Sequence, residues 1–197
     1  LAFGANLRAA VLRDRRKVDI SRGSQRVTVQ DWAFSFSYKG FAFLEPGFGT
    51  ILPSPGSVLH GVVYRITKAD MHQIVRTEGS GYRVVEVPAQ CEDGSTVRAL
   101  ALVTPVSLCE ATAVPSKRYK KLVMDGLEEH DVDPEYRAWV ASHPHHMPSW
   151  ADKVVSAVFI VLLSPLLILL FLSSRAKLNI PGLRPLFSKI MRSTFFL

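Results

Sequence analysis

TKADMHQIVRTEGSGYRVVEV, residues 67–87, is the stretch that decides the fold, because it joins a predicted helix to a predicted strand through a glycine-rich turn. The helix is predicted over residues 68–77, the turn over residues 78–81 and the apolar strand over residues 82–87. Glu78 opens the turn, where the carbonyl end of the helix repels an anion by about 0.3–1 kcal/mol. This position, and any burial, favours a protonated carboxyl, so Glu78 is a candidate general base. The alternative is a solvated glutamate at a helix end.

Strands and helices alternate irregularly around this stretch, which is typical of an α+β domain. Three helix starts carry capping signals, namely Thr67 followed by Asp70, Ser116, and Asp133 before a proline. The sequence Ser54-Pro55-Gly56 predicts a turn. Strands are predicted over residues 31–38, 59–66, 82–90 and 97–103, and further helices over residues 7–18 and 116–130 and from residue 134.

The formal net charge of +7 is concentrated near the C-terminus. Residues 1–150 contain 18 basic and 16 acidic residues, a net charge of +2, whereas residues 151–197 carry +5. The globular part is therefore near neutral and shows no basic stripe with interleaved aromatic residues, so we expect no nucleic-acid partner. The chain opens at Leu1 within a predicted strand end, and we expect it to be a fragment or a processed chain.

The cysteine and histidine residues give weak signals for a disulfide or a metal. Cys91 and Cys109 form neither a Cys-x-x-Cys unit nor a disulfide framework, and we expect both to be reduced and half-buried. The histidines of residues 143–146 lie in a Pro- and His-rich linker, predicted over residues 144–153. A metal site there is the minority interpretation, because no third ligand follows at a suitable spacing. We therefore expect no metal and no other cofactor.

Residues 154–172 (Val154 to Leu172) form a run without any charge, which predicts a C-terminal transmembrane helix of about 20 residues. Pro165 would kink it, and a shallow insertion is the alternative. The basic, apolar tail over residues 173–197 predicts an amphipathic segment on an anionic membrane surface. The positive-inside tendency places this tail in the cytosol, so a single span would put the globular domain on the opposite side of the membrane. The low cysteine count favours the cytosol for the globular domain instead. We expect a single-pass membrane protein whose globular domain faces the cytosol, with a homodimer left open.

Two further motifs point to a ligand site. The sequence Phe3-Gly-Ala-Asn-Leu7 lies between a strand end and a helix, where small residues admit a ligand close to the backbone. Free N–H groups at such a junction can hold a carboxylate or an oxyanion. The second motif, residues 116–121 (SKRYKK), is either a ligand-contacting helix start at Tyr119 or a solvated basic face. Each motif by itself is weak evidence.

Taken together and in this order, the motifs of residues 1–143 resemble the γ-glutamylcyclotransferase family. That family has a Tyr-Gly-Ser-Asn-Leu motif, an SPG stretch followed by Val-x-Gly-Val-Val, a Glu-Gly followed by Tyr, a Tyr-Lys-Lys helix and a later Pro-x-Tyr. The matching positions are residues 3–7, residues 53–64, Glu78 with Gly79 and Tyr82, residues 119–121 and residues 133–136.

The resemblance implies a catalytic domain over residues 1–143. Its expected fold is a small, closed or nearly closed mixed β-barrel with flanking helices. The implied reaction is the attack of the α-amine of a γ-glutamyl group on its own γ-carbonyl, which releases 5-oxoproline and an amine. The resemblance assigns the general acid/base role to Glu78. The residues that it implies for substrate binding are Leu1, Ala2, Phe3, Gly4, Ala5, Asn6, Tyr82 and Tyr119.

The leaving group stays open, because Phe3 and Ala5 replace the Tyr and Ser of the family motif. The leading hypothesis is a membrane-anchored lyase acting on a γ-glutamyl amino acid, peptide or glutathione-derived adduct. Membrane-tethered fungal members of the family, which act on such adducts, make the last substrate class attractive. The alternatives are a γ-glutamylamine cyclotransferase and a catalytically silent, membrane-tethered binding module.

Overall fold

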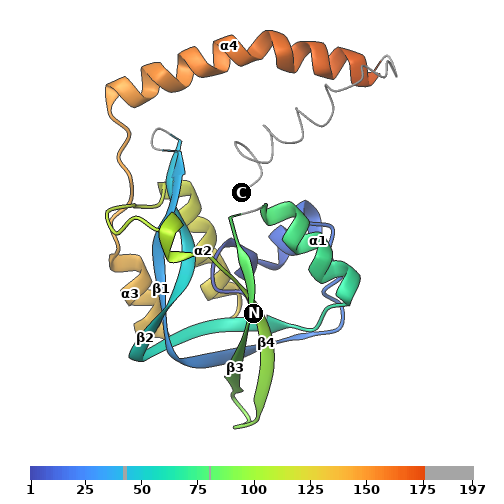
Figure 1. The fold of residues 1–197 in the computed structure, drawn as a ribbon, viewed down its shortest axis with the longest axis vertical. Helices are drawn as coiled ribbons and strands as arrows, with labels where there is room; N and C mark the ends of the chain where they lie inside the picture. The colour runs from blue at the N-terminus through green and yellow to red at the C-terminus, as the bar shows by residue number, and fades with distance from the viewer. Residues whose placement is uncertain (42–43, 80, 176–197) are drawn as a thin grey trace. The chain divides into compact units, whose positions relative to one another are not determined.

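The computed structural model describes residues 1–41, 44–79 and 81–175. They divide into two units, residues 1–146 and a second unit from residue 147 onward. The first unit contains an α+β fold with one four-stranded antiparallel sheet in the order β2-β1-β3-β4 (Figure 1). The strands are β1 (Ser24–Phe41), β2 (Glu45–Tyr64), β3 (Arg83–Cys91) and β4 (Thr96–Val103).

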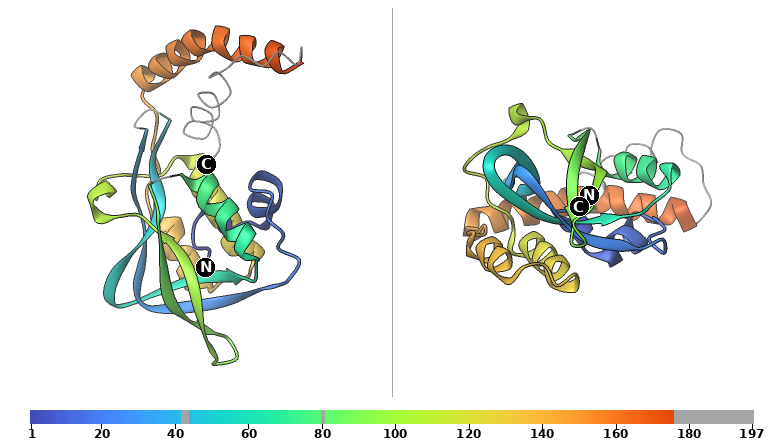
Figure 2. Two further views of the ribbon diagram at one scale, coloured as in Figure 1. Left: turned by 45° about the vertical axis from the view of Figure 1, so that its right-hand side comes forward. Right: turned by 90° about the horizontal axis from the view of Figure 1, so that it is seen from below.

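β1 and β2 run antiparallel along nearly their whole length as one long, bent ribbon (Figure 2). The β3–β4 hairpin joins this ribbon only where Val27 and Thr28 pair with Cys91 and Gln90. Sequence analysis predicted a closed or nearly closed mixed barrel. Within the described strands, all pairing is antiparallel rather than mixed, and no strand pairing links β2 directly to β4. Residues 1–2 lie between these two strands, since Ala2 pairs with Val62 of β2 and the Leu1 amino group donates to the Leu100 carbonyl of β4 at 2.7 Å.

The Ser54-Pro55-Gly56 sequence does not reverse the chain, as the predicted turn would. It forms a bulge inside β2, since the pairing jumps from Gln30–Val58 to Trp32–Pro53. Gly56 has a φ of 79°, and its N–H donates to the Asp31 carboxylate at 2.8 Å. The turn chemistry was predicted correctly, but its effect is to bend a continuous strand rather than to end it.

The helices of the first unit are α1 (Lys68–Glu78), α2 (Lys117–Glu129) and α3 (Pro134–Ser142). Their N-termini confirm the capping predictions. The Thr67 and Asp70 side chains form a reciprocal capping box, and the Ser116 and Asp133 side chains cap α2 and α3. The predicted helix over residues 7–18 was wrong in extent, because the chain forms only a 3-10 turn η1 (Ala5–Leu7) and a π-helical turn η2 (Val11–Arg15).

The inner face of α1 packs on the η2 segment. Ile74 of α1, Leu12 and Val18 around η2, and Leu102 of β4 form one buried cluster. α2 approaches the N-terminal loop so closely that a Cβ on Gly126 would lie 2.5 Å from the Leu7 Cβ. These two contacts bring the N-terminal loop, η2 and the end of α1 together, which places the candidate site.

The second unit contains α4 (Trp150–Arg175), which includes the predicted transmembrane segment over residues 154–172. Among the residues that the structure describes, no helix is both long and apolar enough to cross a membrane. The structure therefore does not support the predicted span. The predicted basic tail falls almost wholly on residues 176–197, which lie outside the described residues.

Candidate active site

Glu78 is the last residue of α1, and its side chain is only 6 % exposed. The helix ends here because Gly79 follows with a φ of 88°, in the left-handed region that glycine adopts readily. The Gly79 N–H still donates to the Val75 carbonyl at 3.3 Å. The Glu78 carboxylate is thus fixed at the mouth of the turn rather than solvated at a frayed helix end.

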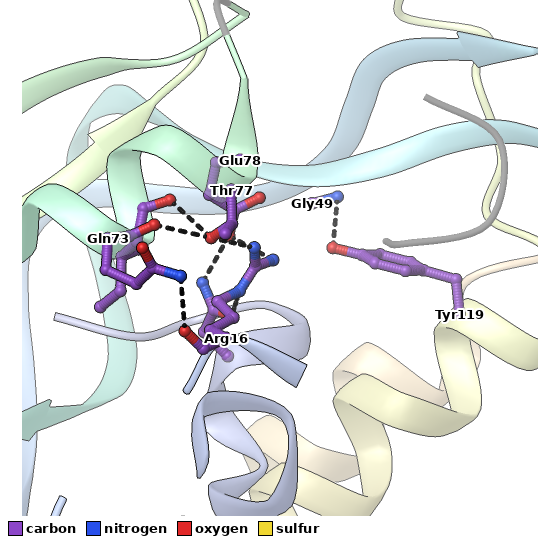
Figure 3. Close-up of polar contacts among 8 residues, drawn as sticks. Arg16, Gly49, Gln73, Thr77, Glu78 and Tyr119 are labelled. Atoms are coloured by element: carbon purple, nitrogen blue, oxygen red, sulfur yellow. Dashed lines mark hydrogen bonds and ion pairs between the residues drawn. The ribbon is translucent and has the colours of Figure 1, made fainter. Parts of the chain in front are cut away.

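Asn6 and Arg16 hold one oxygen of the Glu78 carboxylate. Asn6 Nδ2 donates to Oε1 at 2.6 Å, and Arg16 Nη2 pairs with the same oxygen at 2.7 Å. Arg16 Nε also donates to Asn6 Oδ1 at 2.7 Å, which closes a three-residue ring and fixes the orientation of the asparagine amide. Figure 3 shows the guanidinium of Arg16 directed at the end of α1.

Arg16 is itself fully engaged and only 4 % exposed. Its Nη1 donates to Thr77 Oγ1 at 3.0 Å, and its backbone carbonyl accepts from Gln73 Nε2 at 3.1 Å (Figure 3). A buried carboxylate is costly unless a cation and hydrogen bonds compensate it, and Arg16 supplies that charge. The pair is therefore a closed, satisfied network rather than a surface ion pair.

The second carboxylate oxygen of Glu78 differs from the first. Oε2 accepts no hydrogen bond from any residue that the structure describes, whereas Oε1 accepts two. An ionised carboxylate can accept up to about four hydrogen bonds. Within the described ranges, Oε2 is therefore the oxygen of Glu78 that no hydrogen-bond donor holds.

Tyr119, in the first turn of α2, is buried at 3 % exposure. Its hydroxyl oxygen accepts from the Gly49 N–H at 3.0 Å (Figure 3). A Cβ on Gly4 or on Gly49 would lie 3.1 or 3.0 Å from this oxygen, so both glycines admit the ring. Burial raises the pKa of Tyr119, the bond from Gly49 opposes this, and the charge of Glu78 raises it further. The hydroxyl thus stays protonated and can donate its hydrogen.

Two further tyrosines, Tyr82 and Tyr38, lie near Glu78. Their rings meet edge to face at 5.0 Å between centroids. Burial raises the pKa of Tyr82, and the nearby Tyr119 and Glu78 raise it further. Burial also raises the pKa of Tyr38, with a contribution from Glu78. A Cβ on Gly81 would lie 1.9 Å from the Tyr38 hydroxyl, so Tyr38 requires a glycine at the end of the turn.

The structure brings some of the predicted substrate-binding residues to Glu78 and gives others a different task. Asn6 reaches Glu78 directly. The Ala2 N–H and C=O both pair with Val62 of β2, at 2.8 and 2.9 Å, so residues 1–2 continue the sheet. Phe3, Gly4 and Ala5 are buried, with the Phe3 ring tilted against a core phenylalanine. Residues 3–5 therefore form the buried part of the loop that leads to Asn6.

Sequence analysis missed Arg16 and Tyr38. Arg16 lay within the helix predicted over residues 7–18, and nothing in that prediction turned its side chain toward Glu78. One signal was available, because Leu12 precedes Arg16 by four residues and residues at this spacing share a helix face. Leu12 is 2 % exposed, and the same face carries Arg16 inward. Tyr38 had no comparable signal in the sequence.

Neither cysteine is joined in a disulfide; Cys91 is buried and Cys109 is half-buried. In the described part of the chain, no group of three or more His, Cys, Asp or Glu side chains is arranged to hold a metal ion. The polar side chains that contact the Glu78 carboxylate are one neutral amide, that of Asn6, and one guanidinium, that of Arg16. Such an arrangement can bind a small zwitterion and move one proton.

Comparisons with known proteins identify the family of the chain. Residues 7–121 match the profile of the family described as gamma-glutamyl cyclotransferase, AIG2-like. Gamma-glutamyl cyclotransferase aclK of Aspergillus oryzae is 30% identical to the chain, over 89% of this chain and 73% of the relative. Gamma-glutamyl cyclotransferase gliK of Aspergillus fumigatus is 29% identical, over 86% of this chain and 71% of the relative.

Solved structures share the fold. A structure described as gamma-glutamyl cyclotransferase superposes with a TM-score of 0.66 at 24% identity, covering 78% of this chain and 94% of that one. At this identity the likeness is evidence of fold only. The family profile spans more than half of the chain, and the relatives cover most of it. The chain therefore belongs to the gamma-glutamyl cyclotransferase, AIG2-like family and is an enzyme of that type.

Proposed function

We propose that Glu78 is the general base of an intramolecular cyclisation that releases 5-oxoproline from a γ-glutamyl compound. The observation that carries this proposal is the asymmetry of its carboxylate, with Oε1 held by Asn6 and Arg16 and Oε2 free among the described residues. A carboxylate held by one oxygen presents the other in a fixed direction. Fixed direction is what a base needs in order to meet a bound ammonium group within about 2.6–3.2 Å.

The proposed reaction moves two protons through Glu78, one after the other, from the attacking nitrogen to the leaving nitrogen. Glu78 Oε2 takes a proton from the α-ammonium of the substrate, and the freed amine nitrogen attacks the γ-carbonyl carbon. A C–N bond forms, and the carbonyl oxygen becomes an oxyanion. The protonated Glu78 then donates this proton to the leaving nitrogen, the original amide C–N bond breaks and the oxyanion returns to a carbonyl. Glu78 takes the second proton from the ring nitrogen, which becomes the lactam N–H, and passes it to the released amine. The products are 5-oxoproline and the amine as its ammonium ion, and Glu78 is regenerated.

Arg16 holds the Glu78 side chain in place during this cycle. Because both side chains are buried, the guanidinium is the compensating charge whenever the carboxylate is ionised. Asn6, fixed by Arg16 Nε, prevents the carboxylate from rotating. The enzyme mainly has to hold a folded conformer, and such orientation can supply several of the roughly 7–11 kcal/mol available to well-placed groups.

Tyr119 is the proposed donor to the substrate. Its oxygen already accepts from Gly49, which leaves the O–H hydrogen available for a carboxylate or a developing oxyanion. Its raised pKa, caused mainly by burial, keeps that hydrogen in place. Tyr82 and the buried loop of residues 3–5 are proposed to shape the wall around the glutamyl head.

For the substrate, we propose a glutathione-derived adduct first, then a γ-glutamyl amino acid or peptide, and the leaving group is the amine released from it. A γ-glutamylamine is the alternative within the same chemistry. The similarity to fungal gamma-glutamyl cyclotransferases over most of the chain supports the family reaction without naming the amine. A catalytically silent binding module is the weaker hypothesis. The hydroxyls that Phe3 and Ala5 lack belong to buried positions, and the Glu78 network is complete without them.

Release of 5-oxoproline by the purified chain tests the proposal. The substrates are glutathione, glutathione S-conjugates, γ-glutamyl-alanine and γ-glutamyl-lysine, each followed by chromatography of the product. We expect release from at least one of them, and the preferred substrate identifies the leaving group. A folded chain that releases 5-oxoproline from none would support the binding module instead.

Two partner expectations remain predictions, namely membrane attachment through residues 154–172 and the basic tail, and a homodimer. Flotation of the full chain with vesicles rich in anionic lipid tests the first. Binding that weakens with salt is expected if the basic residues contribute about 1 kcal/mol each. A chain that stays at the bottom of the gradient at low salt would contradict attachment.

A further inference from the structure

Glu45, at the start of β2, is a second buried carboxylate, and the Glu78 network does not use it. Its side chain is 8% exposed. Oε1 accepts from the Ser116 N–H at 2.6 Å, and Oε2 accepts from the Ser116 hydroxyl at 2.6 Å. Arg118 Nη2 approaches Oε2 at 3.1 Å from a largely exposed position. The carboxylate is therefore bonded to the two donors of one residue.

Ser116 connects this carboxylate to Tyr119. It is the N-cap of α2, and its Oγ accepts from the Tyr119 N–H at 3.0 Å. The path of hydrogen bonds thus runs from the Tyr119 amide to the serine hydroxyl and from that hydroxyl to Glu45. No other side chain intervenes.

β2 also holds the far end of Tyr119. The Gly49 N–H donates to the Tyr119 hydroxyl, and Gly49 follows Glu45 by four residues in the same strand. β2 therefore holds the backbone of Tyr119 through Glu45 and Ser116, and it holds the phenol hydroxyl of Tyr119 through Gly49. The distance between these two points determines where the hydroxyl lies.

A charged carboxylate is not needed merely to cap α2, because Ser116 alone satisfies the Tyr119 amide. Burial raises the pKa of Glu45, while its bonds to Ser116 and Arg118 lower it, so the bonds offset part of a desolvation cost. The charge of Glu45 fixes the position of Ser116 more firmly, because charge-assisted hydrogen bonds are shorter and about twice as strong as neutral ones. The helix N-terminus also favours an anion at this place.

We propose that Glu45 is a positioning residue, which fixes the first turn of α2 on β2 so that the Tyr119 hydroxyl faces the substrate. The inference rests on the proposed role of Tyr119 in the cyclotransferase reaction. Glu45 acts through Ser116 and Tyr119 and touches no reacting atom.

A double-mutant cycle on the full chain tests this role. The variants are Glu45→Gln, Tyr119→Phe and the pair, with Glu128→Gln as the control for an exposed carboxylate. We expect Glu45→Gln to lower kcat/KM about ten-fold, since hydrogen bonds to a charged group contribute roughly 1.5–3 kcal/mol and 1.4 kcal/mol is a factor of ten. In the Tyr119→Phe background the same change should cost less than about two-fold, because the coupled hydroxyl is gone.

A second readout does not need activity. Alkaline titration of phenolate absorbance, wild type minus Tyr119→Phe, isolates the ionisation of Tyr119. The charge of Glu45 by itself raises the pKa of Tyr119, so Ser116→Ala, which breaks the path and keeps that charge, is titrated beside Glu45→Gln. If the path holds Tyr119 in its buried place, both variants lower the pKa of Tyr119 toward its ordinary value of 10.0. A pKa lowered by Glu45→Gln alone reports the lost charge and overturns the positioning role. Should Glu45→Gln fail to fold, as judged by circular dichroism, Ser116→Ala breaks the same path and replaces it in both measurements.

The outcomes separate this inference from the proposed function. Equal losses from Glu45→Gln in both backgrounds, or an unchanged titration of Tyr119, overturn the positioning role. If the wild-type chain releases no 5-oxoproline from any substrate, the proposed function fails. The titration then still decides whether Glu45 sets the position of Tyr119.

Discussion

At the scale of single residues, the buried pair of Glu78 and Arg16 is the unusual feature of this chain. Exposed ion pairs contribute little to stability, with a median of about 0–1 kcal/mol. This pair is different, because its side chains are 6 % and 4 % exposed and every donor group of the guanidinium has a partner. Loss of one member would leave an uncompensated charge in the interior.

Arg16→Met is therefore expected to lower the free energy of unfolding by about 3–5 kcal/mol. Urea denaturation followed by circular dichroism measures it. Arg13→Met is the matched control, since Arg13 is 62% exposed and pairs only with its neighbour Asp14. Adding Glu78→Gln to Arg16→Met should recover much of the loss by removing the unpaired charge. A loss from Arg16→Met no larger than the loss from Arg13→Met would show that the pair is not buried in solution.

At the scale of elements, α1 was predicted well because its determinants are local. Thr67 and Asp70 are three residues apart and form the capping box, while Gly79 ends the helix. The helix presents Glu78 to the site and Ile74 to the core. A change at the start of α1 should therefore lower stability without altering the chemistry at its end.

Thr67→Ala should lower the free energy of unfolding by about 0.5–2 kcal/mol, because the cap then leaves an amide of the first turn without its acceptor. We expect kcat/KM to change less than about two-fold at a temperature where the variant is folded, since a cap acts on stability. Thermal unfolding and 5-oxoproline release measure the two effects. Lys68→Ala, at the exposed first residue of the helix, is the control. A kinetic loss greater than the loss of folded protein would place Thr67 in the site.

At this scale, the sequence could not predict the contacts between residues that are far apart in the chain. Glu78 as the candidate base, the caps and the two strands β3 and β4 were predicted from neighbouring residues. The partner of Glu78 was not, because Arg16 reaches it only through the fold, and a run of basic residues normally faces water. The turn predicted at Ser54-Pro55-Gly56 proved to be a bulge for a related reason, since local turn chemistry is the same whether a strand ends or bends.

At the scale of the whole molecule, burial acts on every tyrosine in the chain. Burial is the largest cause of a raised pKa at each of them, and the folded chain therefore favours the neutral phenol. The residues are Tyr38, Tyr64, Tyr82, Tyr119 and Tyr136. Because unfolded tyrosine titrates at about 10, the unfolded chain loses these protons first as the pH rises.

Stability should consequently be constant with respect to these groups below pH 10.0 and fall as the pH rises above it. The sign follows from proton binding, since above that pH the folded state holds more phenolic protons than the unfolded state. Urea denaturation at stepped alkaline pH measures the slope. Tyr119→Phe should make the slope shallower, because phenylalanine does not titrate. Stability that stays level above pH 10.0 would show that the tyrosines ionise equally in both states.

The chain belongs to a family of cyclotransferases, and the central claim is that Glu78 is the general base of the reaction. The most direct measurement is kcat for 5-oxoproline release by the wild-type chain, by Glu78→Gln and by Glu128→Gln, on the preferred γ-glutamyl substrate. With Glu78 as the base, Glu78→Gln should lose on the order of 10²–10⁴-fold in kcat, measured at a temperature where circular dichroism shows the variant to be folded, because the loss of its partner leaves the buried Arg16 charge uncompensated and lowers stability. Glu128→Gln, on the exposed end of α2, should keep wild-type activity. A folded Glu78→Gln variant with activity within a few-fold of wild type would contradict the account.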